Sequence, residues 1–191
     1  MSAPERLQYR ADAVGVRSAY CAVDIVEIAA LRERRPEILG IAASRGWTLP
    51  EIGRSVAASQ QLAICVRPER WLLLHPTAAN GSHAVVWESA VADNAAVVEL
   101  SSALTLLRLS GPAVREMLAR GCRLDLDPAV FVAGHAAATI MAQVSVILVA
   151  LSSDMLLVTP STTARHFSEW LAHTTAPFGF ETEREIAFHE I

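Results

Sequence analysis

Short apolar runs alternate along this chain with segments whose apolar positions recur every three or four residues. The runs are rich in β-branched and aliphatic residues and predict strands at 21–30, 62–66, 71–75, 95–100, 104–109, 137–141, 144–151 and 155–159. The periodic segments predict helices that begin near Pro36, Thr77, Pro112 and Ser161. Residues 47–60 show neither pattern and are expected to form a long loop, and 176–191 have no clear period. Strands and helices mixed in this way predict an α+β fold.

The segment Leu109–Pro128, LSGPAVREMLARGCRLDLDP, combines a strand end, a helix and a regular loop. The apolar spacing predicts the buried face of the helix, at Val114, Met117, Leu118 and Gly121. In the loop that follows, apolar and acidic residues alternate. We expect Leu124 and Leu126 to be buried on one side, with Asp125 and Asp127 facing the other side.

Two stretches echo each other, WLLLHPTA at Trp71–Ala78 and MLLVTPST at Met155–Thr162. Each has an apolar strand, a polar residue, a proline and a hydroxyl residue that opens a helix, and each follows a strand–helix–strand–strand series. The echo predicts two packed β-α-β-β-α (ferredoxin-like) halves; coincidence between two strand-to-helix junctions is the alternative. The predicted division is an N-terminal arm, one compact domain with two pseudo-repeats, and a C-terminal tail, at residues 1–19, 20–175 (repeats 20–93 and 95–174) and 176–191.

Composition narrows the class of protein. Hydrophobic residues make up 52% of the 191 residues, and an apolar excess beyond the needs of a core favours a permanent subunit interface. The net charge of −4 and the lack of a basic stripe argue against a nucleic-acid partner. All 16 basic residues are arginine, which excludes Schiff-base lysine chemistry and the P-loop lysine.

The N-terminus and the cysteines bear on location. The first 15 residues lack the apolar core of a signal peptide. The longest apolar stretch, 136–151, is interrupted by polar residues and is short for a membrane span, so two buried strands are expected there. Cys21, Cys65 and Cys122 are odd in number and lack metal-ligand spacing, which fits a reducing compartment. We therefore expect a cytoplasmic protein without membrane association.

Three side chains in the regular loop are candidates for chemistry. Cys122, flanked by two arginines, could be a nucleophile if a base lay nearby, and an inert thiol is the interpretation we favour. Asp125 and Asp127 could form an acid/base pair, which requires different environments for the two carboxyls. An aspartate before proline, as at Asp127–Pro128, is typical of a turn, so we favour loop carboxylates.

The histidines, tryptophans and arginines show no catalytic motif. No metal-ligand, dinucleotide, P-loop or hydrolase signature includes the histidines, at His75, His83, His135, His166, His173 and His189. The tryptophans could line a pocket for a flat ligand such as a pterin, or belong to the core; they are Trp47, Trp71, Trp87 and Trp170. The cluster Arg32–Glu37 could receive a polyanionic ligand or an acidic partner, or be a solvated helix start. We predict no catalytic, cofactor-binding or metal-binding residues in this chain.

The stretch VVELSSALTLLRLSGPAVREMLARGCRLDLDP, residues 97–128, resembles the gamma subunit of heterotetrameric sarcosine oxidase. That family shows an LSGP helix start, a GCxLDLxP loop, then a phenylalanine and a glycine, here Leu109–Pro112, Gly121–Pro128, Phe131 and Gly134. The strand Arg67–Leu74 and the closing Trp170–Leu171 are similar to further family features. The KGCYxGQE motif of the YgfZ group and the catalytic aspartate segment of the glycine-cleavage T-protein are missing.

The resemblance implies a fold similar to the folate-binding part of the aminomethyltransferase and YgfZ group. It implies a non-catalytic assembly subunit in an oxidoreductase complex that demethylates sarcosine, or another N-methyl amino acid, to glycine. The partners would be alpha, beta and delta subunits, with FAD and FMN on beta, and NAD and a tetrahydrofolate-linked domain on alpha. This chain itself would carry no cofactor.

Two alternatives remain beside this interpretation. The chain could be a folate-dependent aminomethyltransferase-like or folate-binding protein that acts alone, or a stand-alone ligand-binding module that forms homo-oligomers. For the assembly role, the aromatic residues of the tail, Phe178, Phe180 and Phe188, are predicted to form a docking arm.

Overall fold

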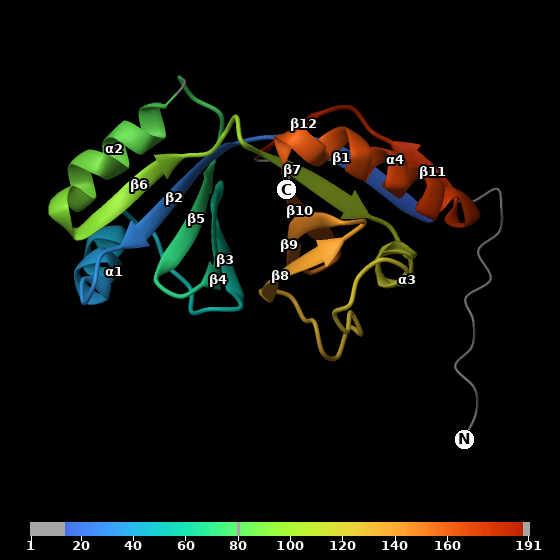
Figure 1. Ribbon diagram of the computed structural model, residues 1–191, viewed down its shortest axis with the longest axis horizontal. Helices are drawn as coiled ribbons and strands as arrows, with labels where there is room; N and C mark the ends of the chain where they lie inside the picture. The colour runs from blue at the N-terminus through green and yellow to red at the C-terminus, as the bar shows by residue number, and fades with distance from the viewer. Residues whose placement is uncertain (1–13, 80, 189–191) are drawn as a thin grey trace.

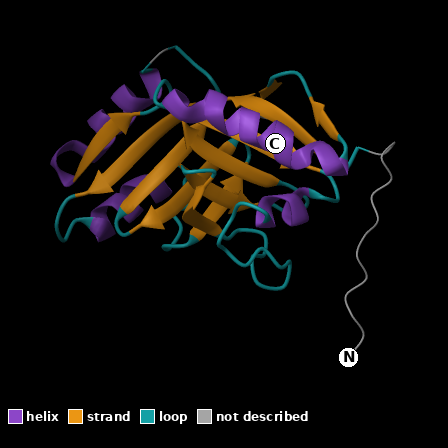
Figure 2. Ribbon diagram, turned by 45° about the vertical axis from the view of Figure 1, so that its right-hand side comes forward, coloured by secondary structure: helices purple, strands orange, loops and turns teal. Residues whose placement is uncertain are grey.

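The computed structural model describes residues 14–79 and 81–188. In this part of the chain two sheets lie face to face between two pairs of helices (Figures 1 and 2). The N-terminal half comprises β2 (Asp24–Ala30), α1 (Arg35–Ser44), β3 (Arg54–Ala58), β4 (Gln61–Arg67), β5 (Arg70–His75), α2 (Ser82–Val91) and β6 (Ala95–Glu99). The C-terminal half comprises β1 (Val16–Ala22), β7 (Leu104–Ser110), α3 (Val114–Ala119), β8 (Ala136–Met141), β9 (Val144–Ala150), β10 (Met155–Pro160), α4 (Ala164–Thr175), β11 (Phe180–Thr182) and β12 (Ile186–Ala187). The prediction of an α+β fold with two packed halves is confirmed.

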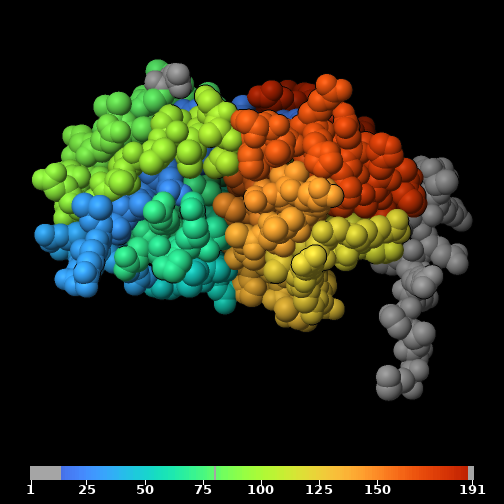
Figure 3. Space-filling model, viewed as in Figure 1, coloured from blue at the N-terminus to red at the C-terminus, as the bar shows by residue number. Residues whose placement is uncertain are grey.

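The two sheets share a strand arrangement. The N-terminal sheet has the order β3-β4-β5-β2-β6, and the C-terminal sheet has the order β11-β1-β7-β10-β9-β8, with β12 also beside β1. In each half, the strand before the first helix, β2 or β7, pairs antiparallel with the last strand of a three-strand meander, β5 or β10. The two echoing stretches, Trp71–Ala78 and Met155–Thr162, therefore begin with equivalent strands of the two halves. Figure 3 shows the halves side by side, with the blue-to-green residues on the left and the orange-to-red residues on the right.

Side-chain alternation explains why these strands are apolar along their length. In β5, Leu72 and Leu74 face the other sheet, while the alternate residues Trp71 and Leu73 face α1 and α2. In β10, Leu156 and Val158 likewise join the layer between the sheets, and their neighbours pack under α3 and α4. We call the first cluster the inter-sheet layer and the two others the N-terminal and C-terminal outer cores. A strand buried on both faces needs apolar residues at every position.

A reciprocal pair of backbone hydrogen bonds joins the two halves where β3 and β8 begin. The N–H of Ser55 donates to the carbonyl of Gly134 over 2.8 Å, and the N–H of Ala136 donates to the carbonyl of Gly53 over 2.9 Å. Arg54 and His135 form an antiparallel bridge between them. Both glycines have a positive φ, +79° for Gly53 and +82° for Gly134, a conformation that side chains rarely adopt. The joint is thus approximately two-fold symmetric.

The prediction of a long loop at 47–60 is wrong, because β3 lies within it. This strand, RSVAA, is short and mostly exposed, so it has little apolar signal. Its hairpin to β4 turns at Ser59 and Gln60, both with positive φ, without the Asn-Gly or Asp-Gly pair that signals such turns. With β3, the N-terminal half has three strands between its helices, as the C-terminal half has close to the predicted ranges 137–141, 144–151 and 155–159. The predicted β-α-β-β-α series counts two strands at this place.

Other boundaries also differ from the predictions. The strand predicted at 21–30 is two strands, because the chain crosses from one sheet to the other at Val23. The first strand begins at Val16, so it includes residues 16–19 of the predicted arm; residues 1–13 lie outside the described residues. The helix predicted from Thr77 begins at Ser82, after Gly81 with a φ of +73°.

The C-terminal tail is part of the fold and not a free arm. Its strands β11 and β12 run parallel to β1, with Val16 opposite Phe180 and Cys21 opposite Ile186. Phe178 is buried in the C-terminal outer core, and Phe188 is buried in the inter-sheet layer. The prediction of a docking arm of phenylalanines is therefore wrong for these two side chains, which the chain's own core already contains.

Helix α3 and helix α4 meet at a glycine. A Cβ at Gly121, just after α3, would overlap the indole ring of Trp170 on α4. Gly40, in the middle of α1, is an opposite case, because a Cβ there would have no heavy atom within 4 Å.

We expect Gly121→Ala to lower the free energy of unfolding by about 1–3 kcal/mol, because the added methyl group forces α3 and α4 apart. The matched variant Gly40→Ala should raise it by about 0.5–1 kcal/mol, because alanine is the better helix former. Urea denaturation of the isolated chain measures both. Equal effects of the two variants would contradict the close helix contact.

Candidate functional site

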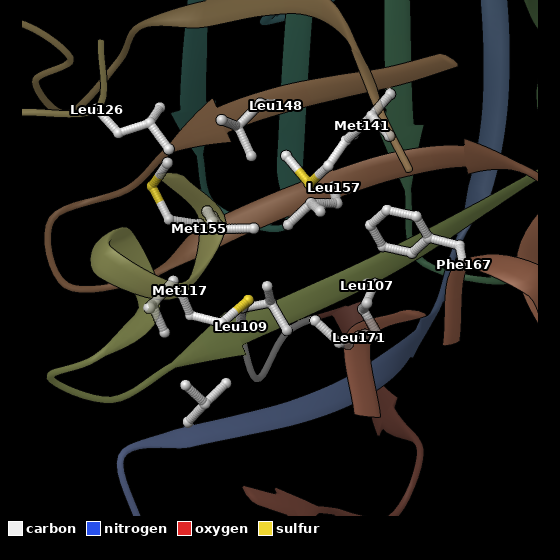
Figure 4. Packing of buried hydrophobic residues seen from close by; sticks show 14 of the residues in the cluster. Leu107, Leu109, Met117, Leu126, Met141, Leu148, Met155, Leu157, Phe167 and Leu171 are labelled. Atoms are coloured by element: carbon white, nitrogen blue, oxygen red, sulfur yellow. The ribbon is translucent and has the colours of Figure 1, made fainter. Parts of the chain in front are cut away.

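The loop between α3 and β8 is the candidate site that the sequence singles out. It is fastened by Arg115 of α3, whose Nη1 donates to the carbonyl oxygens of Leu126 at 2.8 Å and Phe131 at 2.9 Å. The side chains of Leu126 and Phe131 are buried in the C-terminal outer core. Figure 4 shows Leu126 beside Met155 and Leu148 of this core. One arginine and two apolar anchors therefore hold the loop against the sheet. The role of Arg115 depends on tertiary contacts and has no signal in the local sequence.

The two loop aspartates shape the backbone. An oxygen of Asp125 accepts the backbone N–H of Asp127 at 3.0 Å, and an oxygen of Asp127 accepts that of Ala129 at 2.8 Å. Both are exposed, whereas Leu124 is half-buried and Leu126 is buried, so the predicted alternation is confirmed. Each carboxylate makes a separate local turn of the kind that aspartate favours.

The other candidate side chains have structural surroundings too. Cys122 is half-buried and packs against the C-terminal outer core. Trp47, Trp71 and Trp87 are buried in the N-terminal outer core, and Trp170 is partly buried against the other outer core. The indole N–H of Trp71 donates to the carbonyl of Pro50 at 2.9 Å. The core interpretation of the tryptophans therefore holds for all four.

The arginine cluster at residues 32–37 starts α1 on the surface. Arg34 pairs with Glu37 at 3.0 Å, and Arg35 pairs with Glu51 at 2.7 Å. Exposed pairs of this kind contribute little to stability. The arrangement matches the solvated helix start, because each of these two guanidiniums already has a carboxylate partner.

The structure brings together two histidines that no sequence motif links. The rings of His75, at the end of β5, and His83, in α2, stack with centroids 4.1 Å apart. The indole N–H of Trp87 donates to Nε2 of His75 at 3.3 Å, so His75 is held as the neutral acceptor. His83 lies 3.8 Å from a carboxylate oxygen of Asp24, which also accepts the backbone N–H of Ala78. The group fastens α2 to the sheet.

Equivalent positions of the two halves carry ion pairs of opposite polarity. Glu27 of β2 is buried and accepts hydrogen bonds from Arg67 and Arg70 at the hairpin of β4 and β5. At the matching position of β7, Arg108 donates to Asp154, which precedes β10, with Nη2 2.6 Å from the carboxylate. Each pair closes one flank of the inter-sheet layer.

Among the described residues, no group of three or more histidine, cysteine or acidic side chains is arranged to hold a metal ion. Over residues 14–79 and 81–188, no helix has both the length and the apolar character needed to cross a bilayer.

Comparison with known proteins gives the family. The model of the family described as "Sarcosine oxidase, gamma subunit family" matches residues 39–177, well over half of the chain and including the whole loop. The chain belongs to the sarcosine oxidase gamma subunit family. A sarcosine oxidase subunit gamma from an Arthrobacter species is 28% identical over 145 residues, which are 74% of this chain and 71% of the relative.

Solved structures agree with the fold expected of a gamma subunit. A chain of the heterotetrameric sarcosine oxidase from Corynebacterium sp. U-96, in complex with pyrrole 2-carboxylate, superimposes with a TM-score of 0.77 at 21% identity, covering 90% of both chains. The glycine cleavage system aminomethyltransferase T from Bartonella henselae matches with a TM-score of 0.62 at 14% identity. That match covers 92% of this chain but 49% of the aminomethyltransferase, so this member of the gamma subunit family spans about half of that enzyme.

The histidine pair makes the stability of this gamma-family chain depend on pH. Burial, with a smaller contribution from His83, lowers the pKa of His75 to about 3, from an ordinary value of 6.5. Between pH 6.5 and 3, His75 therefore binds a proton in the unfolded state but not in the folded state. The contribution of neutral His75 to the free energy of unfolding is fully present above pH 6.5. It is lost as the pH falls from 6.5 toward 3, by up to about 1.4 kcal/mol per pH unit.

We expect His75→Gln to flatten this dependence, because glutamine still accepts from Trp87 and does not titrate. Denaturant unfolding of both proteins at pH 7, 6 and 5 gives the free energy of unfolding as a function of pH. These pH values lie above the range in which carboxylates titrate, so the two slopes can be compared directly. Parallel slopes for the two proteins would show that His75 is not held neutral.

Proposed function

We propose that this chain is the non-catalytic assembly subunit of a heterotetrameric flavin-dependent oxidase of sarcosine or a similar N-methyl amino acid. The family match over residues 39–177 carries the proposal. Its support within the chain is that the candidate reactive groups of the family loop serve the fold. Asp125 and Asp127 make local turns, and Cys122 packs against a core.

In this proposal the chemistry belongs to the partner subunits, alpha, beta and delta. The beta subunit would hold FAD and FMN, which would take two electrons and two protons from the N-methyl amine of sarcosine and pass them to oxygen as hydrogen peroxide. The alpha subunit would hold NAD and tetrahydrofolate, which would take up the oxidised carbon as methylene-tetrahydrofolate when its bond to the nitrogen of glycine breaks. This chain contributes a rigid surface that keeps those subunits in register.

The rigidity has a physical basis in the fold. Three apolar clusters run through the molecule, and the inter-sheet layer is shared by both sheets. Interiors packed in this way resist deformation. A subunit that positions others must keep its own shape when they bind, and this architecture meets that requirement.

The alternative of a folate protein that acts alone has less support. It depended on tryptophans lining a pocket for a flat ring, and Trp47, Trp71 and Trp87 are core residues here. The likeness to the aminomethyltransferase is a likeness of fold.

Affinity purification of the tagged chain from its native host tests the proposal. We expect larger partner chains in fixed ratio and a yellow eluate with flavin absorbance bands.

A colourless chain recovered alone would contradict the proposal. Calorimetric titration of that chain with tetrahydrofolate would then decide for the folate-binding alternative if heat is released at high micromolar concentration.

A further inference from the structure

An apolar groove opens on the C-terminal sheet at the hairpin of β8 and β9. It encloses about 370 Å³ and is lined without any charged side chain, chiefly by Leu104, Ala138, Ile140, Ile147, Val158 and Pro160. Ile140 is 63% exposed, among the most exposed large apolar side chains in the described part of the chain. Large apolar side chains left open in this way mark interaction sites when they cluster around one concave surface.

The groove continues the interface between the two sheets. Val158 belongs to the inter-sheet layer, and Leu104 and Ile147 pack against it. The N-terminal sheet contacts β8 through β3 and β4, yet Ala138 and Ile140 on this face of β8 are exposed. The surface thus has the composition of a protein interior while its far end lacks a covering element.

The matching hairpin in the other half is covered by the chain itself. By strand register, Ala57 and Leu62 of β3 and β4 pair as Ala138 and Ile147 of β8 and β9 do. Ala57 and Leu62 line a cavity of about 250 Å³, and Phe188 of the C-terminal tail forms part of the same wall. The tail extends along β1 through Ile186 to reach it, and Phe188 packs in one cluster with Leu62. An extended segment with a large apolar side chain therefore packs against this surface in the N-terminal half.

The second hairpin also differs in length. Pairing of β8 with β9 continues through Ile140 and Met141, beyond the last position at which β3 pairs with β4. The extension turns at Ala142 and Gln143, both with positive φ, and carries Ile140 outward. The second half thus lengthens the apolar wall of its groove where the first half ends its hairpin.

We propose that this groove receives an extended segment of a partner subunit, which inserts an aromatic or aliphatic side chain against Ile140 and Ile147 as Phe188 does in the other half. The inference rests on the proposed assembly function and adds the place and the chemistry of one contact. A neutral, apolar segment fits because the lining offers no charge to pair with.

Purification of the tagged chain with its partners, comparing Ile140→Glu with Val85→Glu, tests the groove. Val85 on α2 is 64% exposed and apolar, so it matches Ile140 in chemistry but lies outside the groove. Both variants should melt within a few degrees of the unaltered chain, because both sites are open to solvent. We expect Ile140→Glu to reduce recovered partner at least tenfold, because it buries a charge, and Val85→Glu to stay within twofold.

If Ile140→Glu recovers as much partner as the unaltered chain, the groove is not the docking site, and the proposed assembly function still stands. Failure of the unaltered chain to recover any partner would overturn both. A photo-reactive residue placed at position 140 identifies the occupant. Cross-linking to an apolar segment of a partner subunit supports the proposal, and cross-linking only to a second copy of this chain, seen as a dimer, overturns it.

Discussion

The layer between the two sheets is the constraint on which the rest of the fold depends. Each sheet must bury both faces, one against the other sheet and one against helices, and this requires strands that are apolar at every position. Leu72, Leu74, Leu156 and Val158 meet in that layer. High apolar content suggested a permanent subunit interface. Many of these apolar residues lie in the inter-sheet layer and the two outer cores of the chain itself.

The joint at Gly53 and Gly134 is a second connection between the sheets, in which reciprocal hydrogen bonds join the edge strands β3 and β8. The halves differ in detail around this near-symmetric joint. Glu27 with its two arginines in one half corresponds to Arg108 with Asp154 in the other, a reversal of charge that preserves an ion pair at the same strand position. Their hairpins also differ in length, and Phe188 of the tail lines a cavity beside the shorter one.

Much of this architecture could be predicted from sequence, because the spacing of apolar residues matches the positions that are buried. The runs of β5 and β10 are apolar throughout, and the loop after α3 alternates between leucine and aspartate, so both were correctly interpreted. Strand β3 could not be found, because it is short, rich in small residues and turned by Ser59–Gln60. The stacking of His75 on His83 and the grip of Arg115 on its loop are tertiary contacts without a local signal. Family identity came from the loop motif, because the candidate chemistry pointed to no reaction.

In the proposed function this chain has a structural role in the complex and carries no catalytic group. The decisive measurement is the turnover of sarcosine by the assembled complex with Cys122→Ser, Asp125→Asn and Asp127→Asn together in this chain. Asparagine can make the same turns as aspartate, and serine replaces a thiol that packs without a disulfide. We expect a kcat within twofold of that of the unaltered complex. A kcat lowered tenfold or more in a complex that still assembles would contradict it and place catalytic groups in this loop.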